Sequence, residues 1–270
     1  MANQYILRAI AEIWPPANGR KRLLYLSCGG GRTSKLLREK GYAVVATDYS
    51  APPVLGDGIA RVAGVDLNHF LPFKDKSFDA VNLIEVIEHI ENQPQLIREI
   101  GRVLKADGEV VITTPNVLNI VSRLRFLFTG FVRGRVRPVH YTRGPGIAPN
   151  IYLIPFYELS YLLFHAGFEI RRLEKTKIKL GQIIFLPFLY PWMWLLSLEA
   201  VIHAEKDPVQ RRINWQVLKY FFSWPLLLSD NIAVKAKKVS PQHQDHPRWG
   251  RKNSDARKRC EPHLHDQEPR

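Results

Sequence analysis

The feature that most constrains the fold is a strand, a glycine turn and a helix followed directly by a second strand. LLYLS, residues 23–27, is a short apolar run that leads into the glycines of SCGGG, and TSKLLREKG continues as a helix that closes at Gly41. YAVVATD, residues 42–48, is a second apolar run that ends in an acid. Two buried strands joined by a crossover helix pair in parallel, so this segment predicts a βαβ unit.

The same alternation of strands and helices continues along the chain. Strand patterns recur at SFDAVNLIEV, EVVITTPN and EIRRLEKTKI, and helical patterns lie between them at QPQLIREIGRVLKADG and FYELSYLLFHAGF. NIAVKAKK, residues 231–238, alternates apolar and basic residues and predicts a late edge strand that returns to the sheet. This order predicts a doubly wound, mostly parallel α/β sheet.

The glycine turn and the acid after the second strand together indicate a nucleoside site. Glycine lets the backbone approach a ligand closely, and the helix that follows presents free amide groups. Asp48, at the tip of the second strand, can accept two hydrogen bonds from a ribose diol, whereas its charge repels a phosphate. Adenosine fits both requirements.

Over residues 23–179 the sequence resembles the class I S-adenosylmethionine-dependent methyltransferases. LLYLSCGGGRTSKLLREKGYAVVATDYS resembles their first motif and ribose-binding strand, and DLNHFLPFKDKSFDAVNLIEVIEHI resembles their adenine-side loop and fourth strand. REIGRVLKADGEVVITTPN follows in the order of their next helix, turn and fifth strand. The resemblance implies a Rossmann-like sheet of seven strands and S-adenosylmethionine as the cofactor.

By position, the resemblance also implies the residues that bind this cofactor. Gly29 and Gly31 flank its methionine part, Asp48 holds the ribose, and Asp66 and Leu67 contact the adenine. Four further residues are expected to complete the cofactor site, namely Ser27, Cys28, Tyr49 and Glu85.

Two positions depart from the family pattern. Tyr25 stands where the family usually has an acid that helps to hold the ammonium end of the cofactor, and Ser27 stands where it usually has a glycine. A tyrosine cannot supply that charge, although its hydroxyl can accept a hydrogen bond. Two outcomes therefore stay open, weakened or rearranged cofactor binding and a loss of catalysis.

Glu85, Glu88 and His89 resemble a pattern in ubiquinone-pathway O-methyltransferases that can hold a divalent cation against the acceptor oxygens. Their i, i+3, i+4 spacing places them on one helical face if the segment is helical. The alternative, which we favour, gives Glu88 and His89 a structural role without any metal.

A basic and aromatic segment, residues 123–146, follows the fifth strand, where open α/β sheets place loops that bind substrates. His140 is the candidate base that deprotonates a hydroxyl acceptor, or else a structural histidine. Four arginines of this segment are candidates for binding a phosphate or carboxylate of the acceptor, namely Arg133, Arg135, Arg137 and Arg143.

Residues 180–228 interrupt the domain just before its last strand, and they are rich in Trp, Phe, Tyr and Leu. We expect an apolar helical insertion that forms either a lid or an element at a membrane interface, because Pro187, Pro191 and Glu199 disfavour an uninterrupted span. The domain itself then comprises residues 1–179 and 229–238, and the polar residues 239–270 form a disordered tail.

Charge and composition bound the function. The formal net charge of +14 favours anionic partners, but no known nucleic-acid module is visible, so a nucleic-acid partner is not expected. No secretory signal is recognised at the first residues, which predicts a cytoplasmic protein, peripheral at the inner face of the membrane if residues 183–228 bind there. The sequence predicts O-methylation of a small-molecule, glycan or lipid-linked acceptor. An RNA or protein methyltransferase and a catalytically decayed scaffold are the alternatives.

Overall fold

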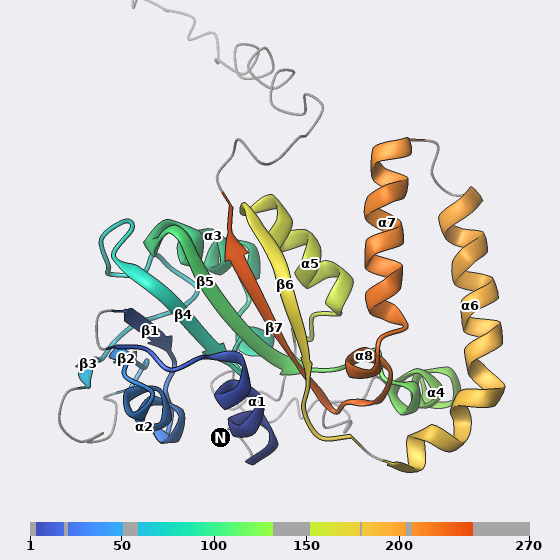
Figure 1. The fold of residues 1–270 in the computed structure, drawn as a ribbon, viewed down its shortest axis with the longest axis horizontal. Helices are drawn as coiled ribbons and strands as arrows, with labels where there is room; N and C mark the ends of the chain where they lie inside the picture. The colour runs from blue at the N-terminus through green and yellow to red at the C-terminus, as the bar shows by residue number, and fades with distance from the viewer. Residues whose placement is uncertain are drawn as a thin grey trace, which may run out of the picture.

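A seven-stranded sheet forms the centre of the molecule (Figure 1). The structure is a computed structural model, and it describes residues 4–18, 21–50, 59–131, 152–178, 180–203 and 207–239. The strands lie in the order β3-β2-β1-β4-β5-β7-β6. β7 is antiparallel to both of its neighbours, and the other strands run parallel to one another. Their bounds are β1 Arg22–Leu26, β2 Ala43–Thr47, β3 Ala60–Val62, β4 Phe78–Ile84, β5 Leu104–Pro115, β6 Phe168–Lys175 and β7 Asn231–Lys238.

Helices cover both faces of this sheet. On one face α1 (Gln4–Ile13) and α2 (Arg32–Glu39) bury their apolar sides against β1, β2 and the middle of the sheet. On the other face α3 (Gln93–Val103) and α5 (Phe156–His165) pack on the residues of β4, β5 and β7. The predicted mostly parallel, doubly wound α/β fold with seven strands is therefore confirmed.

The last strand is not the edge strand that its alternation of apolar and basic residues predicts. β7 lies between β5 and β6, and its apolar residues are buried. The lysines are accommodated because acids and carbonyl groups lie within their reach: Lys235 pairs with Glu109 at 2.9 Å and Lys237 with Asp107 at 3.0 Å. The sheet edge is formed instead by β6.

The segment before β7 is helical, as expected. It contains the 3-10 turn η3 (Leu180–Phe185) and the helices α6 (Leu186–His203), α7 (Pro208–Phe221) and α8 (Trp224–Leu228). In Figure 1, α6 and α7 lie beside the sheet, past β6 and α5, rather than across it. Within the part of the chain that the structure describes, no helix is long and apolar enough to cross a bilayer.

Candidate cofactor site

The residues expected to bind the cofactor meet at the carboxyl edge of the parallel strands. From β1 the strands β2 and β3 are added on one side of the sheet, and β4 is added on the other side. The direction in which strands are added therefore reverses next to β1. Open α/β sheets bind their ligands at such a reversal, outside the carboxyl ends of the strands. The turn after β1, Asp48 after β2, and Glu85 after β4 all lie at this edge.

The turn after β1 is shaped by three residues in the left-handed region of the backbone. Ser27, Gly29 and Gly31 have φ values of 54°, 50° and 73°. A hydrogen bond of 3.0 Å from the Gly31 amide to the Cys28 carbonyl closes the turn, and Gly31 then precedes the first residue of α2. No atom lies within 4 Å of the position where a side chain would begin at Gly29 or Gly30. The turn therefore presents open backbone to a ligand.

Asp48 is tied to this turn. Its Oδ2 accepts a hydrogen bond of 2.9 Å from the Gly29 amide, and its backbone bonds with Val62 and Val65 hold the loop after β3 alongside. This bond occupies one lone pair of the Asp48 carboxylate. It also holds the carboxylate in one orientation relative to the turn, which sets the direction of the remaining lone pairs. Tyr49 follows with its side chain 73% exposed, next to the same opening.

Asp66 caps its own turn. Its Oδ1 accepts from the Asn68 amide at 2.9 Å, and its Oδ2 lies 3.1 Å from Nδ1 of His69. These bonds lower the pKa of Asp66 and keep it ionised, and the bond from the Asn68 amide has the largest effect. The side chain of Leu67 is buried in the core, so only the backbone of Leu67 is available to an adenine ring.

Tyr25, which replaces the usual acid, lies at the end of β1 just before the turn. Its side chain is buried, and a hydrogen bond links it to Thr33 of α2. Burial raises the pKa of the Tyr25 hydroxyl to about 12, so it stays neutral. Ser27 keeps the left-handed conformation that a glycine adopts more easily.

Glu85, Glu88 and His89 do not share a helical face, in contrast to the expectation from their spacing. Glu85 has a φ of 52°, and only Ile87–His89 form a short 3-10 turn, η1. Glu88 is therefore buried while His89 is exposed. Within the described residues, no three His, Cys, Asp or Glu side chains come together in a way that could hold a metal ion.

Glu85 instead joins a polar cluster that sequence reasoning missed. Its Oε1 accepts from the Thr113 hydroxyl at 2.9 Å, and its Oε2 accepts from the Asn231 amide. Glu88 accepts from the Thr114 hydroxyl at 3.3 Å. Burial raises the pKa of both glutamates, and the charge of Glu85 raises that of Glu88 further. Asn231 lies 146 residues from Glu85, so no local pattern could have indicated this pair.

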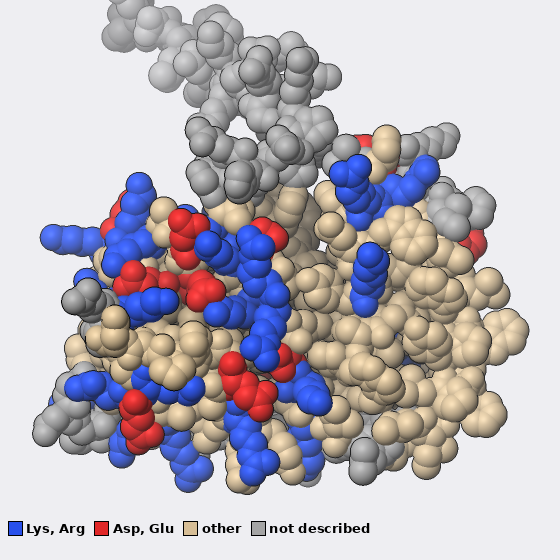
Figure 2. All heavy atoms as spheres, in the orientation of Figure 1, with Lys and Arg blue, Asp and Glu red and all other residues tan. Residues whose placement is uncertain are grey.

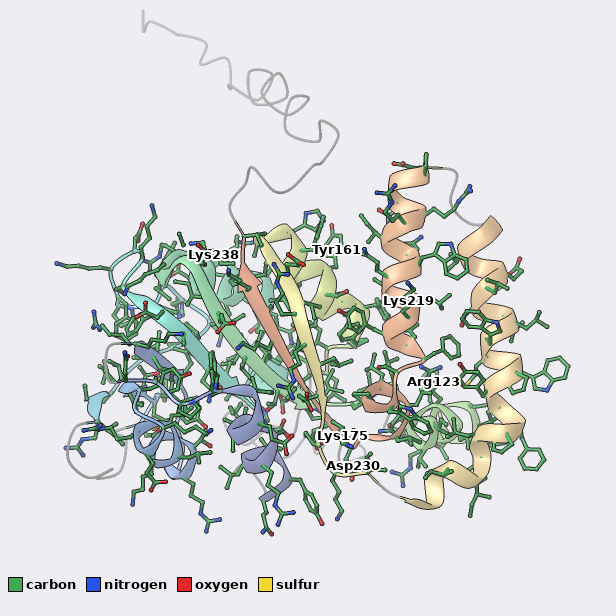
Figure 3. The ribbon with its side chains drawn as sticks, in the orientation of Figure 1. Arg123, Tyr161, Lys175, Lys219, Asp230 and Lys238 are labelled. Carbon is green, nitrogen blue, oxygen red and sulfur yellow. The ribbon has the colours of Figure 1, made fainter. Side chains whose placement is uncertain are left out.

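The carboxyl edge is also joined to the helical segment before β7. The Asn116 amide, just past β5, lies 2.9 Å from the carbonyls of both Leu226 and Ser229. Figure 3 shows Lys175 and Asp230 at the same end of the sheet, and Arg123 on α4 (Ile120–Thr129) near α8. The Asp230 amide donates to the Lys177 carbonyl at 3.0 Å, which links the ends of β6 and β7.

The expected acceptor residues lie outside the described part of the chain. These are the candidate base His140 and the four arginines, Arg133, Arg135, Arg137 and Arg143. Their roles stay predictions.

Comparison with known proteins agrees with this arrangement. Residues 24–112 match the family model of a methyltransferase domain. The chain is 32% identical over 154 residues to a probable S-adenosylmethionine-dependent methyltransferase of Mycolicibacterium smegmatis, which covers 55% of this chain and 52% of that protein. It is 27% identical over 223 residues to the mitochondrial ubiquinone biosynthesis O-methyltransferase of Bos taurus, covering 77% and 56%. The chain thus spans about half the length of these curated relatives.

The fold is shared with solved structures. An S-adenosylmethionine-dependent methyltransferase of Archaeoglobus fulgidus superimposes with a TM-score of 0.51 at 20% identity, over 88% of this chain and 95% of that one. The resemblance to the class I S-adenosylmethionine-dependent methyltransferases is thus confirmed by a family model that matches residues 24–112 and by relatives of that kind. The cofactor of this family is S-adenosylmethionine.

Proposed function

We propose that this protein transfers a methyl group from S-adenosylmethionine to an oxygen of a small-molecule, glycan or lipid-linked acceptor. The observation that carries the proposal is the pairing of the open glycine turn with Asp48, whose Oδ2 bonds the Gly29 amide at 2.9 Å. A glycine turn alone suits many ligands. A fixed carboxylate beside it selects a ribose, because an ionised acid disfavours a phosphate at that point.

The residues present fit the cofactor at three points. Gly29 and Gly30 leave the backbone open. Asp48 offers acceptors for the ribose hydroxyls, and the ionised Asp66 with the Leu67 backbone offers an acceptor and a donor for an adenine edge. The ammonium end lacks the usual acid, because Tyr25 is neutral and bonded to Thr33.

The bound cofactor supplies an electrophilic methyl group on a sulfonium centre. The chain's task is to hold the acceptor oxygen in line with that methyl group and to exclude water, which accounts for a large part of the acceleration in such transfers. The acceptor oxygen loses its proton, and we assign that proton to His140. Glu85 and Glu88, bonded to Thr113 and Thr114, fix the strand ends that border the reacting centre.

Two findings support an oxygen acceptor that is partly lipophilic. The bovine relative is named for an O-methyltransferase step of ubiquinone biosynthesis. In addition, α4 begins four residues beyond Asn116, at the carboxyl end of β5, and its exposed side chains include Phe126, Leu127 and Phe128. An acceptor that approaches this edge therefore passes apolar side chains.

A specific observation also favours a second candidate, a cofactor-binding scaffold without catalysis. Tyr25 removes a charge that the family uses to hold the cofactor, and its hydroxyl is occupied by Thr33. This candidate predicts binding of the cofactor without turnover.

The proposal is tested by methyl transfer from cofactor labelled in its methyl group. The chain is incubated with a total lipid extract, an aqueous metabolite extract and total RNA in parallel, and the label is followed into each. We expect label in the lipid or metabolite fraction, in a bond stable to base as an ether is. Label in RNA contradicts the acceptor class. Binding of the cofactor with no label in any fraction supports the scaffold.

A further inference from the structure

The outward side of α6 is apolar and faces solvent. Phe188, Trp192, Leu195 and Leu196 repeat at helical spacing, and they are 73%, 66%, 56% and 66% exposed. The opposite side of α6 is packed against the protein, because Leu186, Leu189 and Met193 contact a small core formed with α4 and α8. Tyr190 and Trp194 contact the rings of Phe222 and Trp215 of the neighbouring segment. The exposed stripe is thus a separate third side of the helix.

Two elements next to α6 also carry exposed apolar side chains. Ile184 and Phe185 of η3 are exposed directly before α6, and η3 contacts α4. On α4 the consecutive residues Phe126, Leu127 and Phe128 are exposed as well. We call these nine side chains the apolar face: Phe126, Leu127, Phe128, Ile184, Phe185, Phe188, Trp192, Leu195 and Leu196.

The charges around the apolar face have one dominant sign. Across α4, η3, α6 and α7 there are five Lys or Arg residues, Arg123, Arg125, Arg211, Arg212 and Lys219, against the single acid Glu199. Figure 2 shows that charged side chains crowd over the sheet, whereas the side formed by α6 and α7 is largely uncharged, with both basic and acidic groups at its margins. Figure 3 places Lys219 on α7 and Arg123 on α4.

The apolar face together with the basic residues of these elements decides between two kinds of partner, a second copy of the chain and a membrane. A second copy of the chain would bring the same basic residues together in a two-fold interface, where like charges repel. An anionic bilayer complements them, and each basic residue near such a surface strengthens binding about fivefold. Aromatic rings on a helix that is too short or too interrupted to span are typical of binding in the interface plane.

We propose that the apolar face binds an anionic membrane surface, with α6 lying in the interface and α4 and η3 inserted beside it. The placement has a consequence for the active site. Because α4 follows the carboxyl end of β5 and Asn116 bonds the carbonyls of α8, the edge that holds the glycine turn and Asp48 is connected to the membrane-facing elements. This inference does not depend on methyl transfer, since membrane binding is measured without cofactor.

Sedimentation with vesicles tests the proposal. The full chain is mixed with vesicles of phosphatidylcholine, either alone or with about a third phosphatidylglycerol, and the bound fraction is measured against lipid concentration. We expect binding to the anionic vesicles that weakens as salt is raised. Trp192→Ser should weaken it about fivefold or more, and the triple variant Phe188→Ser, Trp192→Ser, Leu196→Ser should reduce it to background.

Tyr161→Ser is the matched control, because Tyr161 on α5 is 62% exposed but lies away from the apolar face. It should bind vesicles as the unchanged chain does. Melting temperature and mass by light scattering are recorded for every variant, so that misfolding is recognised. The proposal is overturned if the unchanged chain stays in the supernatant with anionic vesicles, or if the folded triple variant binds equally well. A dimer that the triple variant dissociates, without vesicle binding, assigns the apolar face to a second copy instead.

Discussion

Glu88 is a buried acid that accepts a hydrogen bond from a neutral hydroxyl, that of Thr114. Glu99, the other deeply buried glutamate, differs because it is paired with Arg102 at 2.7 Å. Burial without a cation favours the protonated form, so the pKa of Glu88 is raised in the folded state. The folded state then binds more protons than the unfolded chain between the two pKa values.

This difference sets a pH dependence of stability. Because the folded pKa lies above the unfolded one, the penalty appears as pH rises through the ordinary glutamate range and is complete above the folded pKa. Glu88→Gln removes it, so we expect the variant to be more stable than the unchanged chain at pH 9, by about 1 to 3 kcal/mol, and nearly equal to it at pH 4. Urea unfolding at both pH values measures this. A gap that does not depend on pH would show that the pKa of Glu88 is the same in the folded and unfolded states, and would contradict the prediction.

Metal dependence is a second prediction at the residue scale. Glu85 is bonded to Thr113 and Asn231, Glu88 is buried, and His89 is exposed. The three side chains therefore do not point toward a common position where one ion could bind. Methyl transfer should therefore survive a chelator. Loss of turnover with chelator and its recovery with magnesium or zinc would make these residues metal ligands.

Among the elements, Asn116 holds the helical segment before β7 onto the sheet. Its amide lies within hydrogen-bond distance of the carbonyls of Pro225, Leu226 and Ser229, and its Oδ1 accepts from the Leu118 amide. Asn116→Ala removes the donor to the Leu226 carbonyl, whereas the Pro225 and Ser229 carbonyls keep the Ser229 amide and the Asn119 side chain as donors. The variant should lower the free energy of unfolding by about 1 to 3 kcal/mol.

Asn214→Ala is the comparison, because the exposed side chain of Asn214 accepts from Gln210 of the same helix. Its loss should cost no more than about 0.5 kcal/mol. Denaturant titration of both variants measures the difference. Equal stabilities would mean that α8 is held without Asn116.

Elements with a clear period could be predicted from the sequence, and pairings across the chain could not. The helix α1 and the strands β1, β2 and β4 follow from apolar spacing and from the glycines and caps that bound them. The short strand β3 was missed, because three residues with two of them exposed carry no period. β7 was expected at an edge, because its lysines read as a solvated face, whereas Glu109 and Asp107 receive them inside the sheet.

The candidate site divides in the same way. The glycine turn and Asp48 could be found because each follows a strand that the pattern indicates. Asp66 could be found only through the family resemblance, because the strand β3 before it carries no period. The bonds from Thr113 and Asn231 to Glu85 depend on how distant strands lie side by side. The hydrogen bond between Tyr25 and Thr33 likewise needs the packing of α2 on β1.

At the scale of the whole molecule, α4 and α8 join the carboxyl edge of the sheet, where the cofactor site lies, to α6 and its apolar face. The net charge of +14 then has a physical interpretation, an attraction of the whole chain to an anionic surface that is stronger at low salt. The central claim is that the carboxyl edge of this sheet binds S-adenosylmethionine through Asp48.

Calorimetric titration with S-adenosylhomocysteine, the demethylated cofactor, measures that claim most directly. Asp48→Ala should weaken binding by about 1 to 3 kcal/mol, because the ribose hydroxyls lose their acceptor. Asp48→Asn keeps an oxygen for the Gly29 amide and should lose less. Asp75→Ala, at a carboxylate that is 69% exposed and pairs with Arg102, should bind as the unchanged chain does. Equal affinities for the unchanged chain and a folded Asp48→Ala variant would contradict the account.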